Sequence, residues 1–163
     1  MTALLFSTAA FADTNINGFA YQLQQAGEIA VNGRDSQNTI TGSQVIHTRG
    51  NLNVSGTAKQ NITADSVNLR AANTSNATTG VQVMKANGNL NAAGTIEQII
   101  STQETSLSAA DMNNSIAGIQ VIAARGNVNI SGAARQMLFS DGITVSQNSN
   151  ENSIVGAQVI SDR

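Results

Sequence analysis

Three nearly identical stretches of seven residues stand at equal distances along the chain. They are GNLNVSG at Gly50–Gly56, GNLNAAG at Gly88–Gly94 and GNVNISG at Gly126–Gly132, and successive copies begin 38 positions apart. Self-similarity at a constant period is the signature of a repeat protein, in which each unit buries its apolar face against the next copy. Few folds meet that condition, so the repeat limits what this chain can form before any other feature does.

The similarity extends well beyond these seven residues. When the units are aligned at this spacing, identical or similar side chains form columns, most of them glutamine, asparagine or valine. The columns are Gln44, Gln82, Gln120 and Gln158; Val45, Val83, Val121 and Val159; Asn51, Asn89 and Asn127; Asn53, Asn91 and Asn129; and Gln60, Gln98 and Gln136. Two more columns hold glycines, Gly50, Gly88 and Gly126, and Gly56, Gly94 and Gly132. We expect the first five columns to be stacking ladders and the glycines to stand at turns.

An all-β fold accounts for columns of this kind. Residues 51–54 alternate between polar and apolar, which is the period of a β-strand, and no stretch shows a convincing helical period. The sequence therefore predicts a β-solenoid, or cross-β stack, of about four 38-residue layers with tight turns. Layers in such a stack lie about 4.8 Å apart, so amide side chains can form hydrogen bonds along it, and glycine supplies turn conformations that other residues resist. Two coils per unit would double that spacing to about 9.6 Å.

The second half of each unit diverges more but keeps its apolar positions. A tight turn is expected in the middle of this half, because Asp-Gly is a strong turn signal. The residues at this place are Asp65-Ser66, Gln103-Glu104 and Asp141-Gly142. The first unit is interpreted as shortened, since matching Gly33 to Gly56 leaves no room for its second half.

The repeats divide the chain into six segments. The first is predicted to be a signal peptide, because a short apolar run ends in Ala10-Phe11-Ala12, an A-x-A cleavage pattern. A mobile apolar terminus or an edge strand is the alternative. The segments are the signal peptide at 1–12, a partial N-terminal repeat at 13–37, full repeats at 38–75, 76–113 and 114–151, and a partial C-terminal repeat at 152–163.

Composition argues against several classes of function. The formal net charge is −2 and 11% of the residues are charged, which leaves no basic patch for nucleic acid or for a membrane surface. The apolar run near the start is too short to span a bilayer, and no other segment is apolar enough. We therefore expect no nucleic-acid partner and no membrane span.

Charged side chains are expected on solvated surfaces rather than in binding sites. Lys59, Glu97 and Arg135 share a column with alternating signs, which places opposite charges on neighbouring layers. A second column holds like charges and must therefore face water; it consists of Arg49, Asn87, Arg125 and Arg163.

No catalytic site is expected. His47 is the only histidine, and its column partners Lys85 and Ala123 do not repeat it. Carboxylates are sparse, and several fall at expected bends, where aspartate is common for backbone reasons. Metal-binding, P-loop and dinucleotide motifs are absent from supporting contexts. We expect no enzyme, no cofactor and no metal site.

The repeats resemble those of bacterial functional amyloid subunits of the Fap type. The pattern is N-x-x-x-G followed by G-N-[LV]-N-x-[SA]-G-x-x-x-Q, and it covers most of residues 15–163. The stretch YQLQQAGEIAVNG at Tyr21–Gly33 is also similar to curlin repeats. The resemblance implies a secreted protein that polymerises into extracellular fibres of a biofilm matrix and supports adhesion at the cell surface. It also implies a nucleator or minor fibre subunit and an outer-membrane secretion pore as further partners.

The mode of assembly is expected to be head-to-tail stacking of the chain on copies of itself. A first and a last layer with open strand edges are templates for another chain, and such a contact does not close into a ring. In this hypothesis the stacked residues act as scaffold. The alternative is that the chain is a β-helical fragment of a secreted surface adhesin.

Overall fold

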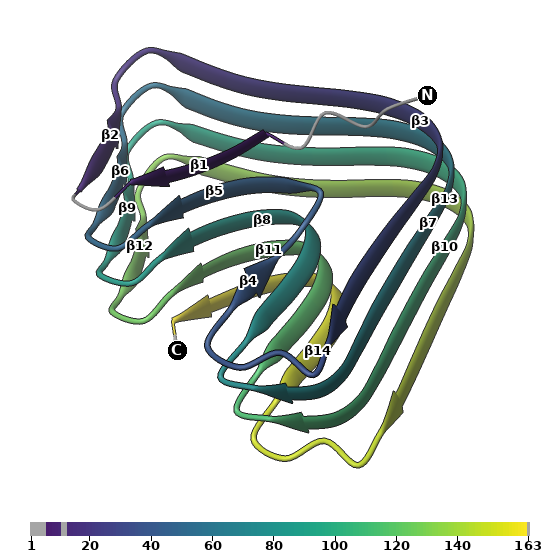
Figure 1. Ribbon diagram of the computed structural model, residues 1–163. Helices are drawn as coiled ribbons and strands as arrows, with labels where there is room; N and C mark the ends of the chain where they lie inside the picture. Colours follow the sequence, from purple (N-terminus) through teal and green to yellow (C-terminus); the bar gives the residue numbers. More distant parts are fainter. Residues whose placement is uncertain (1–5, 11–12, 163) are drawn as a thin grey trace.

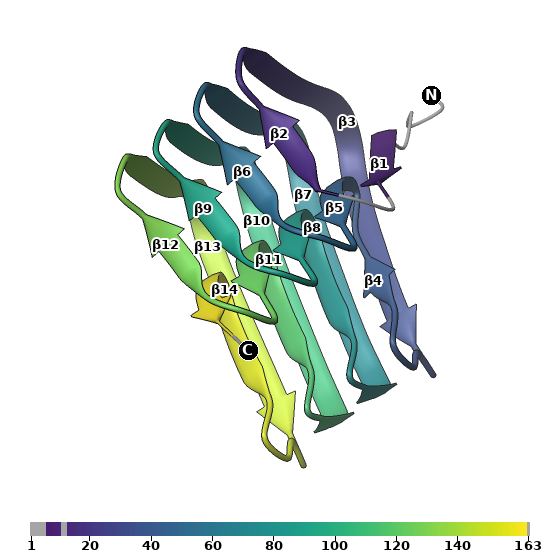
Figure 2. The same cartoon turned by 90° about the vertical axis from the view of Figure 1, so that its left-hand side faces the viewer.

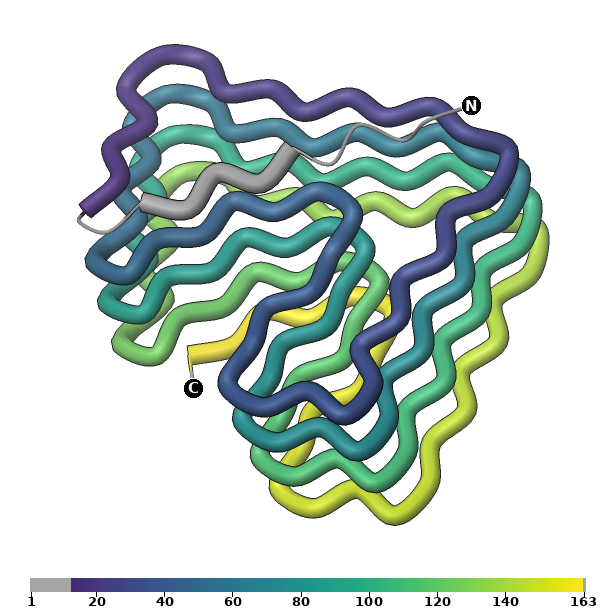
Figure 3. Tube along the Cα trace, in the orientation of Figure 1, coloured from purple at the N-terminus to yellow at the C-terminus, as the bar shows by residue number. Residues whose placement is uncertain are grey.

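The computed structural model describes residues 6–10 and 13–162. Throughout these residues the chain forms β-strands and connecting bends, with no helix, and winds as a β-solenoid of about four turns (Figures 1 and 3). Successive turns lie one behind another, so each strand has its own repeat as a neighbour (Figure 2). The predicted fold class is therefore confirmed.

Each turn contributes strands to three parallel sheets. The short-strand sheet consists of β2 (Thr14–Ile16), β6 (Leu52–Val54), β9 (Leu90–Ala92) and β12 (Val128–Ile130). The long-strand sheet consists of β3 (Phe19–Arg34), β7 (Thr57–Ser75), β10 (Thr95–Asn113) and β13 (Ala133–Asn148). The curved sheet consists of β1 (Phe6–Ala10), β4 (Ile40–Thr41), β5 (Gln44–Thr48), β8 (Thr78–Ala86), β11 (Ile116–Ala124) and β14 (Ile154–Asp162).

The pairing register is one repeat, 38 residues, in every sheet. Val45 pairs with Val83, Val83 with Val121 and Val121 with Val159, so the valine column is a line of direct neighbours. Each 38-residue unit is therefore one coil, and the alternative of two coils per unit is wrong. This register follows from the repeat, because only a shift of one whole unit places every apolar column on its own copy.

The core fills the inside of the coil with aliphatic and small side chains. One cluster joins the long-strand sheet to the curved sheet, where Ile62 and Ile100 pack with Val81 and Ile119. A second cluster lies at the short-strand sheet, where Leu52 and Leu90 pack with Met84 and Ile122. These residues are all fully buried or nearly so. Every residue of β8 and β11 is buried, and both strands have neighbouring strands on either side.

The expected turn in the second half of each unit is not a turn. Asp65, Gln103 and Asp141 lie inside β7, β10 and β13, which bend around one corner of the coil without ending (Figure 1). Local hydroxyl groups stabilise the bend: Thr102 Oγ1 donates to the Glu104 carbonyl at 3.0 Å, and Ser140 Oγ donates to the Gly142 carbonyl at 2.7 Å. Hydrogen bonds from hydroxyl side chains to nearby backbone carbonyls thus take the place of the predicted turn.

The reason given for the turn glycines is also wrong. No described glycine has a positive φ. Asparagine, aspartate and serine take the left-handed positions instead, because their short side chains can hydrogen-bond to the nearby backbone. Two columns adopt this conformation, Asp35, Asn73, Asp111 and Ser149, and Asn38, Asn76, Asn114 and Asn152.

The glycines stand at bends because successive layers approach too closely there for a side chain. A Cβ on Gly56 would lie 1.9 Å from the Gly18 carbonyl oxygen, and one on Gly94 or Gly132 would lie 2.0 Å from the carbonyl oxygen of the glycine one turn earlier. In the other column, a Cβ on Gly88 would lie 2.5 Å from Asn51 Oδ1 and one on Gly126 would lie 2.3 Å from Asn89 Oδ1. Gly50 lies at the corresponding bend of its own turn.

The interpretation of the first unit as shortened is wrong as well. β3 pairs with β7 along nearly its whole length, from Phe19 with Thr57 to Arg34 with Ala72. Gly33 therefore lies beside Ala71, not beside Gly56, and both halves of the unit are present. The error came from matching glycines between the units. The apolar residues of β3 lie in register with those of β7 at the 38-residue spacing.

The predicted signal peptide is described only in part. Phe6–Ala10 forms β1, which pairs with Gln44–Thr48 of β5 at the same 38-residue register. Residues 11 and 12 of the expected cleavage pattern lie outside the described residues. Cleavage at this place stays a prediction.

Candidate assembly site

The glutamine column of the curved sheet forms a hydrogen-bonded ladder. Gln82 Nε2 donates to Gln44 Oε1 at 3.1 Å, Gln120 Nε2 to Gln82 Oε1 at 3.1 Å, and Gln158 Nε2 to Gln120 Oε1 at 2.9 Å. The same amides also donate across the core, for example Gln82 Nε2 to the Ile99 carbonyl of β10 at 2.9 Å. Gln82 and Gln120 are fully buried, so the ladder is an internal seam between two sheets.

A second glutamine ladder runs along the long-strand sheet and faces the first. Gln60 Nε2 donates to Gln22 Oε1 at 2.7 Å, Gln98 Nε2 to Gln60 Oε1 at 2.8 Å, and Gln136 Nε2 to Gln98 Oε1 at 2.8 Å. These amides donate in turn to carbonyls of the curved sheet, including Gln98 to Val121 at 3.2 Å. Gln22 was missed as a member because the first unit was aligned wrongly.

The two asparagine columns behave differently from each other. In the column of Asn53 the side chains form a ladder: Asn53 Nδ2 donates to Asn15 Oδ1 at 2.9 Å, and Asn91 and Asn129 continue it at 2.9 and 3.0 Å. In the column of Asn51 each side chain accepts from the backbone of the next turn. Asn89 N donates to Asn51 Oδ1 at 2.7 Å, and Asn127 N donates to Asn89 Oδ1 at 2.8 Å.

A carboxylate in a buried ladder is expected to destabilise the fold strongly. In Gln98→Glu the new side chain cannot donate to Gln60 Oε1 or to the Val121 carbonyl, and its charge is buried without a cation. We expect a loss of about 3 kcal/mol or more in the free energy of unfolding, measured by urea denaturation. Ser101→Glu, at an exposed position of the same strand, is the control and is expected to change it by less than about 0.5 kcal/mol.

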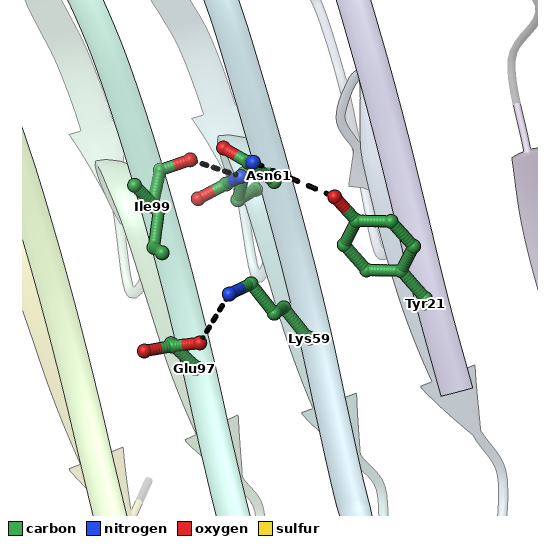
Figure 4. Close-up of polar contacts among 6 residues, drawn as sticks. Tyr21, Lys59, Asn61, Glu97 and Ile99 are labelled. Atoms are coloured by element: carbon green, nitrogen blue, oxygen red, sulfur yellow. Dashed lines mark hydrogen bonds and ion pairs between the residues drawn. The ribbon is translucent and has the colours of Figure 1, made fainter. Parts of the chain in front are cut away.

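The column of alternating charges contains an ion pair between neighbouring layers. Lys59 Nζ lies 2.7 Å from Glu97 Oε2 (Figure 4). Two residues further along β7, Asn61 Nδ2 donates to the Tyr21 hydroxyl at 3.5 Å. Glu97 pairs in register with Arg135, but no ion pair joins them among the described residues. The pair is partly exposed, so we expect it to contribute less than about 1 kcal/mol.

The core is not closed at the end of the last described turn. Ile143, Val145 and Ile160 are 49%, 45% and 52% exposed, although their columns are almost fully buried in the inner turns. The corresponding inner residues are Val67 and Thr105; Leu69 and Leu107; and Met84 and Ile122. These exposed residues lie on β13 and β14, the last strands of the long-strand and curved sheets.

Both ends of the solenoid also carry open strand edges. β2 and β3 are the first strands of their sheets, and β12, β13 and β14 are the last strands of the three sheets. The chain contains no proline, and lysine does not occur in any of these five strands. Their edges therefore lack proline and lysine, two of the devices that prevent pairing with another chain.

The described residues bring no other constellation together. No group of three or more histidine, cysteine or acidic side chains able to hold a metal ion occurs among residues 6–10 and 13–162. In the same part of the chain, no helix is long and apolar enough to cross a membrane. Comparisons with protein-family models, with curated proteins and with solved structures find no match for this chain.

Proposed function

We propose that this protein is a secreted structural subunit that stacks head-to-tail into extracellular, amyloid-like fibres of a biofilm matrix. The observation that carries the proposal is that two glutamine ladders join each turn to a nearly identical turn at one fixed register. Such layers can be added repeatedly, because a further copy presents the same columns of apolar and amide side chains. The partner that best continues these columns is a second copy of the same chain.

The two ends match because they are the same segment of the repeat. The last turn runs through β12, β13 and β14, and the first runs through β2, β3, β4 and β5, three repeats earlier. Stacking one copy on the next continues the columns with identical residues on both sides. Such pairs are Asn129 with Asn15, Gln136 with Gln22, Val145 with Val31, Gln158 with Gln44, and Ile160 with Ile46.

Electrostatics does not oppose this contact. When residues 128–162 of one copy are paired with residues 14–48 of the next, no charged side chain lies directly opposite a like charge. Arg135 comes to lie beside Tyr21, whose ring can accept a cation. The contact joins two different surfaces, so it does not close and repeats into a filament.

The extracellular setting is supported by the predicted signal peptide and by the resemblance to Fap-type repeats. In that setting the protein works as scaffold, with a nucleator or minor subunit and an outer-membrane secretion pore as partners. The amide ladders support a fibre role, because aligned glutamine and asparagine side chains stabilise stacks of identical chains.

The proposal is tested by following the purified protein with thioflavin-T, electron microscopy and fibre diffraction. We expect unbranched fibres with a reflection at about 4.7–4.8 Å along the fibre axis. A protein that stays monomeric for days at high concentration would contradict the fibre, and would favour the β-helical adhesin instead.

A charge placed in the proposed joint is expected to stop growth. Val145→Lys puts an ammonium where Val31 of the next copy would pack, while the side chain stays solvated in the single molecule. We expect fibres to be absent or at least about tenfold shorter by electron microscopy. Ser146→Lys, the next residue on the opposite and exposed face of β13, is the matched control and is expected to grow like the parent. Equal inhibition by both variants would mean that growth does not pass through this end.

A further inference from the structure

The curved sheet encloses a concave corner on the outside of the coil. Lys85 Nζ donates to Thr78 Oγ1 at 2.5 Å, although the two residues are seven positions apart on β8. A straight strand would separate them by roughly 23 Å, so β8 must turn back on itself (Figures 1 and 3). Gly80 makes the turn possible, because a Cβ there would lie 2.7 Å from Val83 Cγ2 and 2.9 Å from the Gly118 carbonyl oxygen.

A groove occupies this corner and crosses three turns of the solenoid. Its volume is about 470 Å³, in the range of small-ligand sites. The left-handed asparagines Asn38, Asn76 and Asn114 line it one turn apart, together with Lys85 and Arg125. An adjoining hollow of about 190 Å³ shares Lys85 and Arg125 and is also lined by His47 and Asn87.

The groove is cationic and has no counter-ion. Of the residues that the structure describes, no aspartate or glutamate lines either hollow, yet Lys85 is only 7% exposed. Burial, and then the charge of Arg125, lower the pKa of Lys85 to about 8. Beside it, His47 Nε2 is buried without a hydrogen-bond partner. A buried ammonium without a counter-ion is costly, and it would gain from an anionic ligand.

We propose that this groove binds an acidic oligosaccharide, with its carboxylate or sulfate groups at Lys85 and Arg125. The cations belong to successive turns, so they suit a chain that lies along the solenoid axis and carries repeated charges. The asparagine amides that line the groove offer donors and acceptors for sugar hydroxyls. The site lies on the side of the coil rather than at its ends, so it does not depend on fibre formation.

The residues that line the groove also favour an acidic oligosaccharide over a nucleic acid. Among the described residues, no phenylalanine, tyrosine or tryptophan lines either hollow, and His47 is the one ring present, so the site offers no row of aromatic side chains on which successive nucleic-acid bases could stack. The net charge of −2 disfavours the long phosphate backbone of a duplex. Both features leave a short acidic glycan as the better fit.

The test measures binding of two fluorescent probes, trigalacturonate and a heparin-derived hexasaccharide, by anisotropy. Lys85→Met keeps the length of the side chain without its charge, and Arg125→Gln removes the second cation. We expect each to weaken binding at least about tenfold. Arg70→Gln is the matched control, since it removes the same charge from an exposed position on β7 outside the groove, and it is expected to bind like the parent. The probe that binds better identifies the acid group as carboxylate or sulfate.

Binding should also depend on pH through Lys85. The parent is expected to bind more weakly at pH 9 than at pH 7, because Lys85 loses its proton through its pKa of about 8. The other groups that face Lys85 are the guanidinium of Arg125 and the ring of His47, and burial lowers the pKa of His47 below its usual value, so His47 stays neutral between pH 7 and pH 9. Lys85→Met should lose this pH dependence.

Three results would overturn the proposal. The first is no binding of either probe by the parent protein. Equal loss in Arg125→Gln and Arg70→Gln would show attraction by charge alone. Binding of inorganic sulfate as tightly as of the hexasaccharide would show a site for a small anion instead of a glycan.

Discussion

Gly94→Ala is expected to destabilise the solenoid by about 3–5 kcal/mol in urea denaturation. Its Cβ would lie 2.0 Å from the Gly56 carbonyl oxygen and 2.6 Å from the Ser55 carbonyl carbon, both of which are backbone atoms. Neither can move alone, because Thr95 N donates to the same Gly56 carbonyl at 2.8 Å. The layers would have to separate at this bend, which breaks the neighbouring ladder of Asn53 and Asn91 as well.

The matched control is Gly142→Ala. A Cβ at Gly142 meets nothing within 4 Å, and the backbone there is not left-handed. Alanine is therefore expected to leave the free energy of unfolding unchanged or to raise it by up to about 1 kcal/mol, since it reduces the freedom of the unfolded chain. If both variants unfold at the same urea concentration, close layer contact is not the reason for glycine at these bends.

Removal of residues 1–12, which cleavage of the predicted signal peptide would also achieve, is expected to accelerate fibre growth about tenfold or more relative to the uncleaved chain. β1 pairs with β5 on the edge where β14 of another copy would stack. The two segments compete for one edge, so the first turn accepts a second copy only while β1 is displaced. A preference of about 1.4 kcal/mol for the covered state would leave roughly one end in ten open. The readout is the elongation rate on preformed seeds, at matched protein concentration.

A second variant separates this effect from a general effect of truncation. Replacing both Ser7 and Thr8 by proline in the full chain removes two backbone donors from β1 and should accelerate growth to a similar extent. Parental growth rates in both variants would mean that β1 does not cover the growing end. That result would not contradict the proposed head-to-tail fibre.

The repeat predicted a coil of about four layers with a 38-residue register, and the structure decided that each unit makes one coil and not two. Identical residues at a 38-residue spacing can all be buried together only when each layer lies on its own copy. The valine column and both glutamine columns were therefore found from the sequence, and each is a line of direct neighbours in the structure. A stacking pattern depends on residue identity at fixed intervals, and this can be read directly from the sequence.

What lies within one layer could not be predicted in this way. The repeat fixes which residues stack but not where the chain bends, so Asp141-Gly142 suggested a turn that is a smooth corner of β13. The role of Gly94 depends on the distance between two backbones, and the second bond of Gln82 depends on which strand faces it across the core. The meeting of Lys85 with Thr78 and Arg125 depends on the fold of β8 around Gly80. These are contacts between chemically different residues, and only the path of the chain in space brings them together.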